Sequence, residues 1–177
     1  ALFDDHSPHL DRFGLLLLTI VAALVVLSLV DIAPEDANVR SGIAGYSAML
    51  LPEIAKHARV TAVVAQENVA DVGVPVIRNS EFDPAKFDAI VCQLGNNPHH
   101  EFVYRRALET PSIVVLHDLV LHHLIVEMTL ARGDREGYID AMRRNHGEAG
   151  AAWAAGRAAG VDAELANFLF PASIEVA

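Results

Sequence analysis

The chain alternates short, strongly apolar runs with longer amphipathic stretches, and this alternation restricts the fold more than any other feature. Apolar runs rich in β-branched residues are expected to form strands. After the N-terminal region, such runs lie at 60–65, 74–77, 89–94 and 112–116. Stretches with helical spacing or composition lie at 41–57, 99–108, 119–128, 139–160 and 163–170. Strands that alternate with helices are typical of a parallel, doubly wound sheet with right-handed crossovers. We therefore predict an α/β fold, a parallel sheet flanked by helices.

The N-terminal region allows two interpretations. Residues 1–12 are polar and read as a tail, whereas 14–30 (GLLLLTIVAALVVLSLV) is interrupted only by Thr19 and Ser28. A run of this length is at the lower limit for a helix that spans a bilayer. The same run also fits a buried helix or arm followed by a first strand near 24–32, because parallel strands buried on both faces are continuously apolar. A signal peptide is disfavoured by the acidic residues in front and by the lack of a cleavage site.

Composition narrows the classes of function. The 177 residues are enough for one domain, and the formal net charge is −10. Such a charge repels phosphate backbones, so we expect no nucleic-acid partner. Cys92 is the only cysteine, which rules out an intramolecular disulfide and fits a cytoplasmic location.

Polar residues follow two of the predicted strands directly. Gly95-Asn96-Asn97 come after 89–94, and His117-Asp118 come after 112–116. In parallel α/β sheets, ligands bind beyond the carboxyl ends of the strands. With Gly42 near the start of the first predicted helix, these residues would line one crevice, and Asn and His suit hydroxyl-rich ligands. His117 and Asp118 also have a structural interpretation, His117 as a core or capping side chain and Asp118 as the N-cap of the next helix.

Other chemistries find little support. The sequence has no G-x-x-x-x-G-K-[ST] loop, no G-x-G-x-x-G fingerprint and no G-x-S-x-G elbow, so we expect no cofactor. His117, Asp118, His122 and His123 crowd together, but on a helix His123 would point about 100° away from His122. No HExxH pattern occurs either, so we expect no metal site.

Two longer segments carry a resemblance. SGIAGYSAMLLPEIAKHARVTAVV and FDAIVCQLGNNPHHEFVYRRALETPSIVVLHDLVLHHLI resemble the first helix, the second strand and the middle section of family 4 glycosyltransferases. The resemblance covers about 31–170 and is strongest over 88–124. It implies a GT-B architecture, two Rossmann-like domains with the active site between them. This chain would be the N-terminal, acceptor-binding domain over 24–177, preceded by a tail and apolar segment over 1–23.

The resemblance also implies an activity and a set of site residues. The reaction would be the retaining transfer of a sugar from a nucleotide-sugar donor to a sugar or lipid-linked acceptor, without a metal. His117 matches a histidine in the cleft near the transferred sugar, and Gly42 matches a glycine loop near the donor diphosphate. We expect His117 to be catalytic and the substrate-binding set to be Gly42, Ile43, Gly95, Asn96, Asn97, Asp118 and His122.

The sequence does not cover all of the GT-B architecture, and this leaves open both the partners and the function of the chain. No part of the sequence matches the second, donor-binding domain, so the expected partners are such a C-terminal domain or a second copy of the chain. The competing interpretation is a non-catalytic Rossmann-like module that binds a partner, or a membrane through 14–30. The chain would then be membrane-associated rather than freely cytoplasmic.

Overall fold

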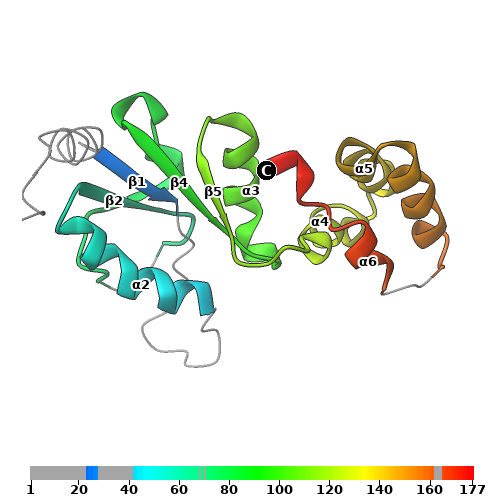
Figure 1. The fold of residues 1–177 in the computed structure, drawn as a ribbon, viewed down its shortest axis with the longest axis horizontal. Helices are drawn as coiled ribbons and strands as arrows, with labels where there is room; N and C mark the ends of the chain where they lie inside the picture. The colour runs from blue at the N-terminus through cyan, green and yellow to red at the C-terminus, as the bar shows by residue number, and fades with distance from the viewer. Residues whose placement is uncertain (1–22, 28–41, 68, 70, 162–164) are drawn as a thin grey trace, which may run out of the picture.

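The computed structural model describes residues 23–27, 42–67, 69, 71–161 and 165–177. Its five strands are β1 (Ala23–Leu27), β2 (Arg59–Val64), β3 (Val76–Arg78), β4 (Ala89–Leu94) and β5 (Ile113–Leu116). They form one sheet in the order β3-β2-β1-β4-β5, and every pair is parallel (Figure 1). The predicted α/β fold with a parallel sheet is confirmed, and β3 lies at an edge as a short strand.

The apolar N-terminal run contributes the central strand. Leu24 of β1 is in register with Val60 of β2 on one side and with Ala89 of β4 on the other. Because residues 23–27 pair within the sheet, a single helix through 14–30 is wrong. The rest of that run, like the polar tail, lies outside the described residues. In the part of the chain that the structure describes, no helix is long and apolar enough to cross a membrane.

Five helices accompany the strands in the described chain: α2 (Gly42–Ala55), α3 (Glu101–Glu109), α4 (His122–Met128), α5 (Arg135–Ala158) and α6 (Ala166–Leu169). Figure 1 shows α4, α5 and α6 gathered beyond the β5 side of the sheet. The chain then turns back, and a final 3₁₀ turn (Ile174–Val176) packs against α3 and α5. Its Glu175 carboxylate accepts hydrogen bonds from Tyr104 (3.0 Å), Arg144 (2.6 Å) and Asn145 (3.2 Å).

The core has two parts, one on each face of the sheet. Val63 of β2 belongs to the larger cluster with β4, α3, α4 and α5, whereas Ala62 and Val64 belong to the smaller cluster with Leu51 of α2. Neighbouring residues of β2 are therefore buried on opposite faces. This explains why the strand reads as a continuous apolar run instead of an alternating pattern.

Two helices begin later than the sequence predicts. Residues 98–100 form a 3₁₀ turn in front of α3, with the Asn97 carboxamide accepting a hydrogen bond from the His99 amide (3.0 Å). Pro98 in the first position of that turn fits its fixed φ. Helix α4 begins at His122 rather than at residue 119. Asp118 therefore does not cap it, and the N-cap interpretation of this residue is wrong.

Candidate functional site at the carboxyl edge of the sheet

The ends of β4 and β5 are tied together by hydrogen bonds. Leu94 is in register with Leu116, so the residues that follow each strand lie side by side. The His117 amide donates to the Leu94 carbonyl (2.8 Å), and the Asn96 amide donates to Asp118 Oδ2 (2.8 Å). The structure thus brings Gly95, Asn96, His117 and Asp118 together at one edge of the sheet.

Asn96 extends this connection to the next helix. Its Oδ1 accepts a hydrogen bond from the Leu124 amide (3.0 Å), in the first turn of α4. Amide groups in a first helical turn have no partner within the helix, and a side-chain oxygen that accepts from one of them stabilises the helix start. Asn96 therefore plays the capping role that the sequence suggested for Asp118, and it does so from a distant loop.

His117 is half-buried and held from two sides. Its Nε2 lies 2.5 Å from Oε1 of the buried Gln93, and the Tyr46 ring of α2 meets it edge-on at a centroid distance of 5.2 Å. Burial lowers the pKa of His117, and the Asp118 carboxylate opposes that effect. The ring is thus held neutral, with Nε2–H donated to Gln93 Oε1. Nδ1 is then the nitrogen able to accept a hydrogen bond from a ligand.

Gly95 is closely surrounded where a Cβ atom would lie. A Cβ atom there would overlap Cδ1 of Ile43 and would lie 3.2 Å from His100 Nε2 and 3.3 Å from Asp118 Oδ2. Ile43, in the first turn of α2, therefore covers the Gly95 loop, so this predicted residue does reach the edge. Gly42 begins α2 beside it. The segment that joins β1 to Gly42 lies outside the described residues.

His122 does not lie at the carboxyl edge of the sheet with the other predicted site residues. It is buried in the first turn of α4, its Nε2 is 2.7 Å from the Tyr138 hydroxyl, and its ring packs edge-on to Trp153 at 4.8 Å. Burial, reinforced by the nearby Arg157 charge, lowers the pKa of His122 to about 4. The structure therefore does not bring His122 to the edge of the sheet, because it joins α4 to α5 instead. Asn97 stays at the edge and caps the 3₁₀ turn.

Two residues of this edge are absent from the predicted set. Gln93 is the one amide side chain within the apolar run 89–94, and that polar interruption was the available signal. His100 is fully buried behind the 3₁₀ turn, and its Nδ1 lies 3.2 Å from the Gln93 carbonyl oxygen. Nothing in the sequence separates it from its exposed neighbour His99. Within the described residues, no group of three or more His, Cys, Asp or Glu side chains is placed to hold a metal ion.

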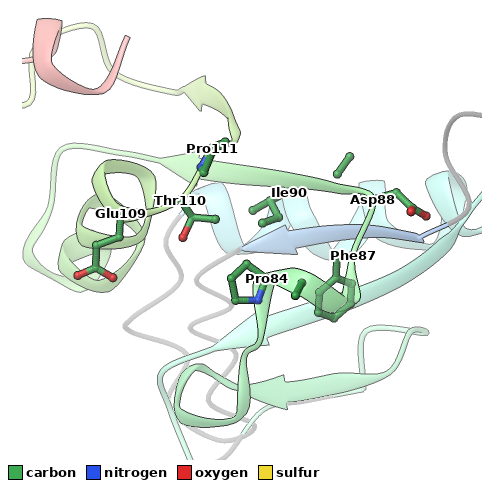
Figure 2. Close-up of a pocket in the computed structure, with 9 residues that line it drawn as sticks. Pro84, Phe87, Asp88, Ile90, Glu109, Thr110 and Pro111 are labelled. Atoms are coloured by element: carbon green, nitrogen blue, oxygen red, sulfur yellow. The ribbon is translucent and has the colours of Figure 1, made fainter.

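A hollow lies at the opposite, amino edge of the sheet. It measures about 380 Å³ and is formed where β4 begins and where the chain enters β5. Figure 2 shows Phe87 and the two prolines Pro84 and Pro111 around it, with Asp88 and Glu109 on opposite sides. Its ionisable groups are two separated carboxylates, and His117 is not among its residues. This hollow offers few hydrogen-bonding side chains that converge on a ligand, unlike the carboxyl edge.

Comparisons of the chain with protein-family models, with curated proteins and with solved structures found no match.

Proposed function

We propose that the chain is the acceptor-binding half of a retaining glycosyltransferase of GT-B architecture, with a Rossmann-like sheet. The observation that carries the proposal is the convergence of His117, Asp118 and the Gly95-Asn96 loop at the carboxyl edge of β4 and β5. That edge adjoins β1, where the chain passes from the β2 side of the sheet to the β4 side. Such a switch point is where open parallel sheets bind ligands.

The chemistry of the edge suits a sugar better than a phosphate. His117 is neutral and presents Nδ1 as an acceptor, and Asp118 adds carboxylate oxygens. Sugar hydroxyls are donors that match these acceptors, whereas a diphosphate would be repelled by the carboxylate. In this proposal His117 contacts the reacting sugar, and the nucleotide diphosphate is held by a second Rossmann-like domain. Transfer then requires that domain to be supplied.

A glycan array tests the binding half of this proposal. We expect the full chain to retain a subset of immobilised glycans or lipid-linked glycans, and the His117→Ala variant to lose them. His123→Ala is the matched control, because His123 is exposed on α4 and faces Glu127 at 4.0 Å. Equal loss in both variants, or no retention of any glycan by the wild-type chain, would overturn the proposal.

An apolar surface on α6 supports the alternative function, a non-catalytic binding module. Leu165, Phe168 and Leu169 are each more than 70% exposed. Exposed apolar clusters often mark sites of association. This alternative predicts self-association that Phe168→Ser and Leu169→Ser together abolish, measured by sedimentation velocity. A chain that stays monomeric at every concentration would argue against it.

A further inference from the structure

His100 is a buried histidine whose proton can be placed from its surroundings. Its side chain is fully buried, and its Nδ1 faces the Gln93 carbonyl oxygen at 3.2 Å. A carbonyl oxygen only accepts, so Nδ1 must carry the proton. Burial lowers the pKa of His100 to about 4, which keeps the ring neutral near pH 7. Nε2 therefore carries a lone pair and is an acceptor.

That acceptor has no donor among the described protein groups. A buried acceptor without a hydrogen bond costs free energy, so such an atom needs a reason to persist. Nε2 lies 3.2 Å from the point that a Gly95 Cβ would occupy, and Asp118 Oδ2 lies 3.3 Å from the same point. Two acceptors on separate elements thus converge on the bare face of Gly95.

Ile43 is the lid of this position. Its Cδ1 atom reaches the same point over Gly95, and it is the far end of a flexible side chain at the start of α2. A change of rotamer moves such a methyl group aside at the cost of a side-chain torsion. The backbone of the Gly95 loop, which is tied to Asp118 through the Asn96 amide, need not move.

We propose that His100 Nε2 and Asp118 Oδ2 form a subsite for a hydroxyl group, which opens when Ile43 turns away from Gly95. The ligand class rests on the proposed function, since a sugar supplies hydroxyl donors next to His117. Two acceptors exclude an anion from this position. Either one can accept the single proton of a hydroxyl group, and together they match the two protons of a vicinal diol. His100 is thereby a binding residue one layer deeper than His117.

Nitrogen NMR of the histidine-labelled full chain tests the subsite, because ¹⁵N shifts report both the tautomer and hydrogen bonding at the unprotonated nitrogen. The probes are methyl glycosides of glucose, galactose and mannose, with their permethylated forms and inorganic pyrophosphate as controls. We expect His100 in the Nδ1–H form, and a shift of its Nε2 signal toward the hydrogen-bonded value with at least one glycoside. The permethylated sugar and pyrophosphate should leave that signal unchanged.

A matched pair of variants isolates the subsite from effects on folding. Ile43→Ala removes the lid and should lower the Kd of the responding glycoside. Ile43→Ala with Gly95→Ala puts a methyl group into the subsite without the clash against Ile43, and should raise that Kd at least tenfold relative to Ile43→Ala alone. Unchanged signals of His122, which lies in another part of the core, verify that both variants fold.

The outcomes separate the subsite from the proposed function. A His100 Nε2 signal that no glycoside shifts in either the wild type or Ile43→Ala overturns the subsite, as does equal affinity of the two variants. If the signal responds but a supplied donor-binding domain and nucleotide-sugars give no transfer, the glycosyltransferase proposal fails and the subsite stands. If sugar transfer occurs but no glycoside shifts the His100 Nε2 signal, the glycosyltransferase proposal stands and the subsite proposal fails.

Discussion

Gln93 is the residue on which the two histidines of the carboxyl edge depend. Its side-chain Oε1 fixes His117 through Nε2, and its main-chain carbonyl fixes His100 through Nδ1. The two rings are therefore held in opposite tautomers by one buried residue of β4. Each ring presents its other nitrogen as an acceptor, so the edge is set up to receive hydroxyl groups.

Substitutions of Gln93 should change His117 in predictable directions. Gln93→Glu places a carboxylate 2.5 Å from the ring, which favours the charged form and should raise the His117 pKa above its wild-type value. Gln93→Leu removes the acceptor, and we expect a mixture of tautomers and a loss of about 1–3 kcal/mol of unfolding free energy. Histidine NMR titrations and chemical denaturation measure both effects. An unchanged His117 pKa in Gln93→Glu would contradict this role of Gln93.

Buried histidines should make the fold sensitive to acid. The pKa values of His100 and His122 fall from 6.5 to about 4 on folding, so in this range the unfolded chain binds more protons than the folded one. The contribution of these two histidines to the unfolding free energy is therefore fully present above pH 6.5, and it is lost as the pH falls from 6.5 toward 4. Each histidine contributes a slope of up to about 1.4 kcal/mol per pH unit.

The variant His122→Gln tests the slope. Glutamine can keep a hydrogen bond to the Tyr138 hydroxyl, but it does not titrate. The pH dependence of the unfolding free energy between pH 6 and 4 should therefore decrease by the equivalent of one bound proton. Urea unfolding at a series of pH values measures it. The same slope in the variant and in the wild type would show that His122 does not titrate as argued.

At the scale of single residues, the sequence identifies the polar site residues that directly follow a strand. It does not identify the polar residues of the site that lie elsewhere. Asn96, His117 and Asp118 follow apolar runs, and the rule about carboxyl ends of parallel strands is enough to group them. His100 could not be recognised, because only the three-dimensional course of the 3₁₀ turn buries it and leaves His99 exposed. The resemblance places His122 in the substrate-binding set, but its partners Tyr138 and Trp153 are far away in sequence and hold it in the core.

At the scale of elements, hydrogen bonds from distant loops decide where helices begin. The predicted helix 119–128 starts at His122, where Asn96 of the β4 loop supplies the cap. The predicted helix 139–160 starts earlier, at Arg135, because the Asp134 side chain accepts from the Gly137 amide (2.8 Å). Gly147 bends this helix with φ 64°, which a glycine adopts readily. Periodicity locates such elements but not their ends.

The Glu175 carboxylate joins the C-terminal turn to α3 and α5. Glu175→Ala removes the acceptor of Tyr104, Arg144 and Asn145, and the proton of the buried Tyr104 hydroxyl loses its acceptor. The Glu175 amide still donates to Asn145 Oδ1 and the Ala172 amide to His146 Nε2. We therefore expect a partial effect: a loss of about 1–3 kcal/mol in unfolding free energy and faster amide hydrogen exchange over 172–177.

Two controls define this effect. Glu175→Gln keeps one acceptor oxygen, so the unfolding free energy should decrease less than in Glu175→Ala. Glu148→Ala removes an exposed carboxylate that pairs with Arg143, and such exposed pairs contribute about 0–1 kcal/mol. Equal losses from Glu175→Ala and Glu148→Ala would contradict the anchoring role of Glu175.

At the scale of the whole molecule, the parallel direction of all five strands gives the sheet a carboxyl edge and an amino edge that differ in their residues. The carboxyl edge gathers hydrogen-bonding side chains from three elements, whereas the amino edge has a hollow with two separated carboxylates. Alternation in the sequence was sufficient for the parallel sheet. The placement of the central strand within 14–30 was not decided by hydropathy, since a bilayer helix and a doubly buried strand have the same composition.

The most direct test asks which edge of the sheet binds a sugar. The ¹⁵N-labelled full chain is titrated with the glycan or methyl glycoside that it retains best, and amide chemical shifts are mapped onto the fold. We predict perturbations at 43–47, 93–100 and 117–118, all at the carboxyl edge. Perturbations confined to the amino edge, at 84–90 and 109–111, would contradict the assignment of the site and the glycosyltransferase proposal that depends on it.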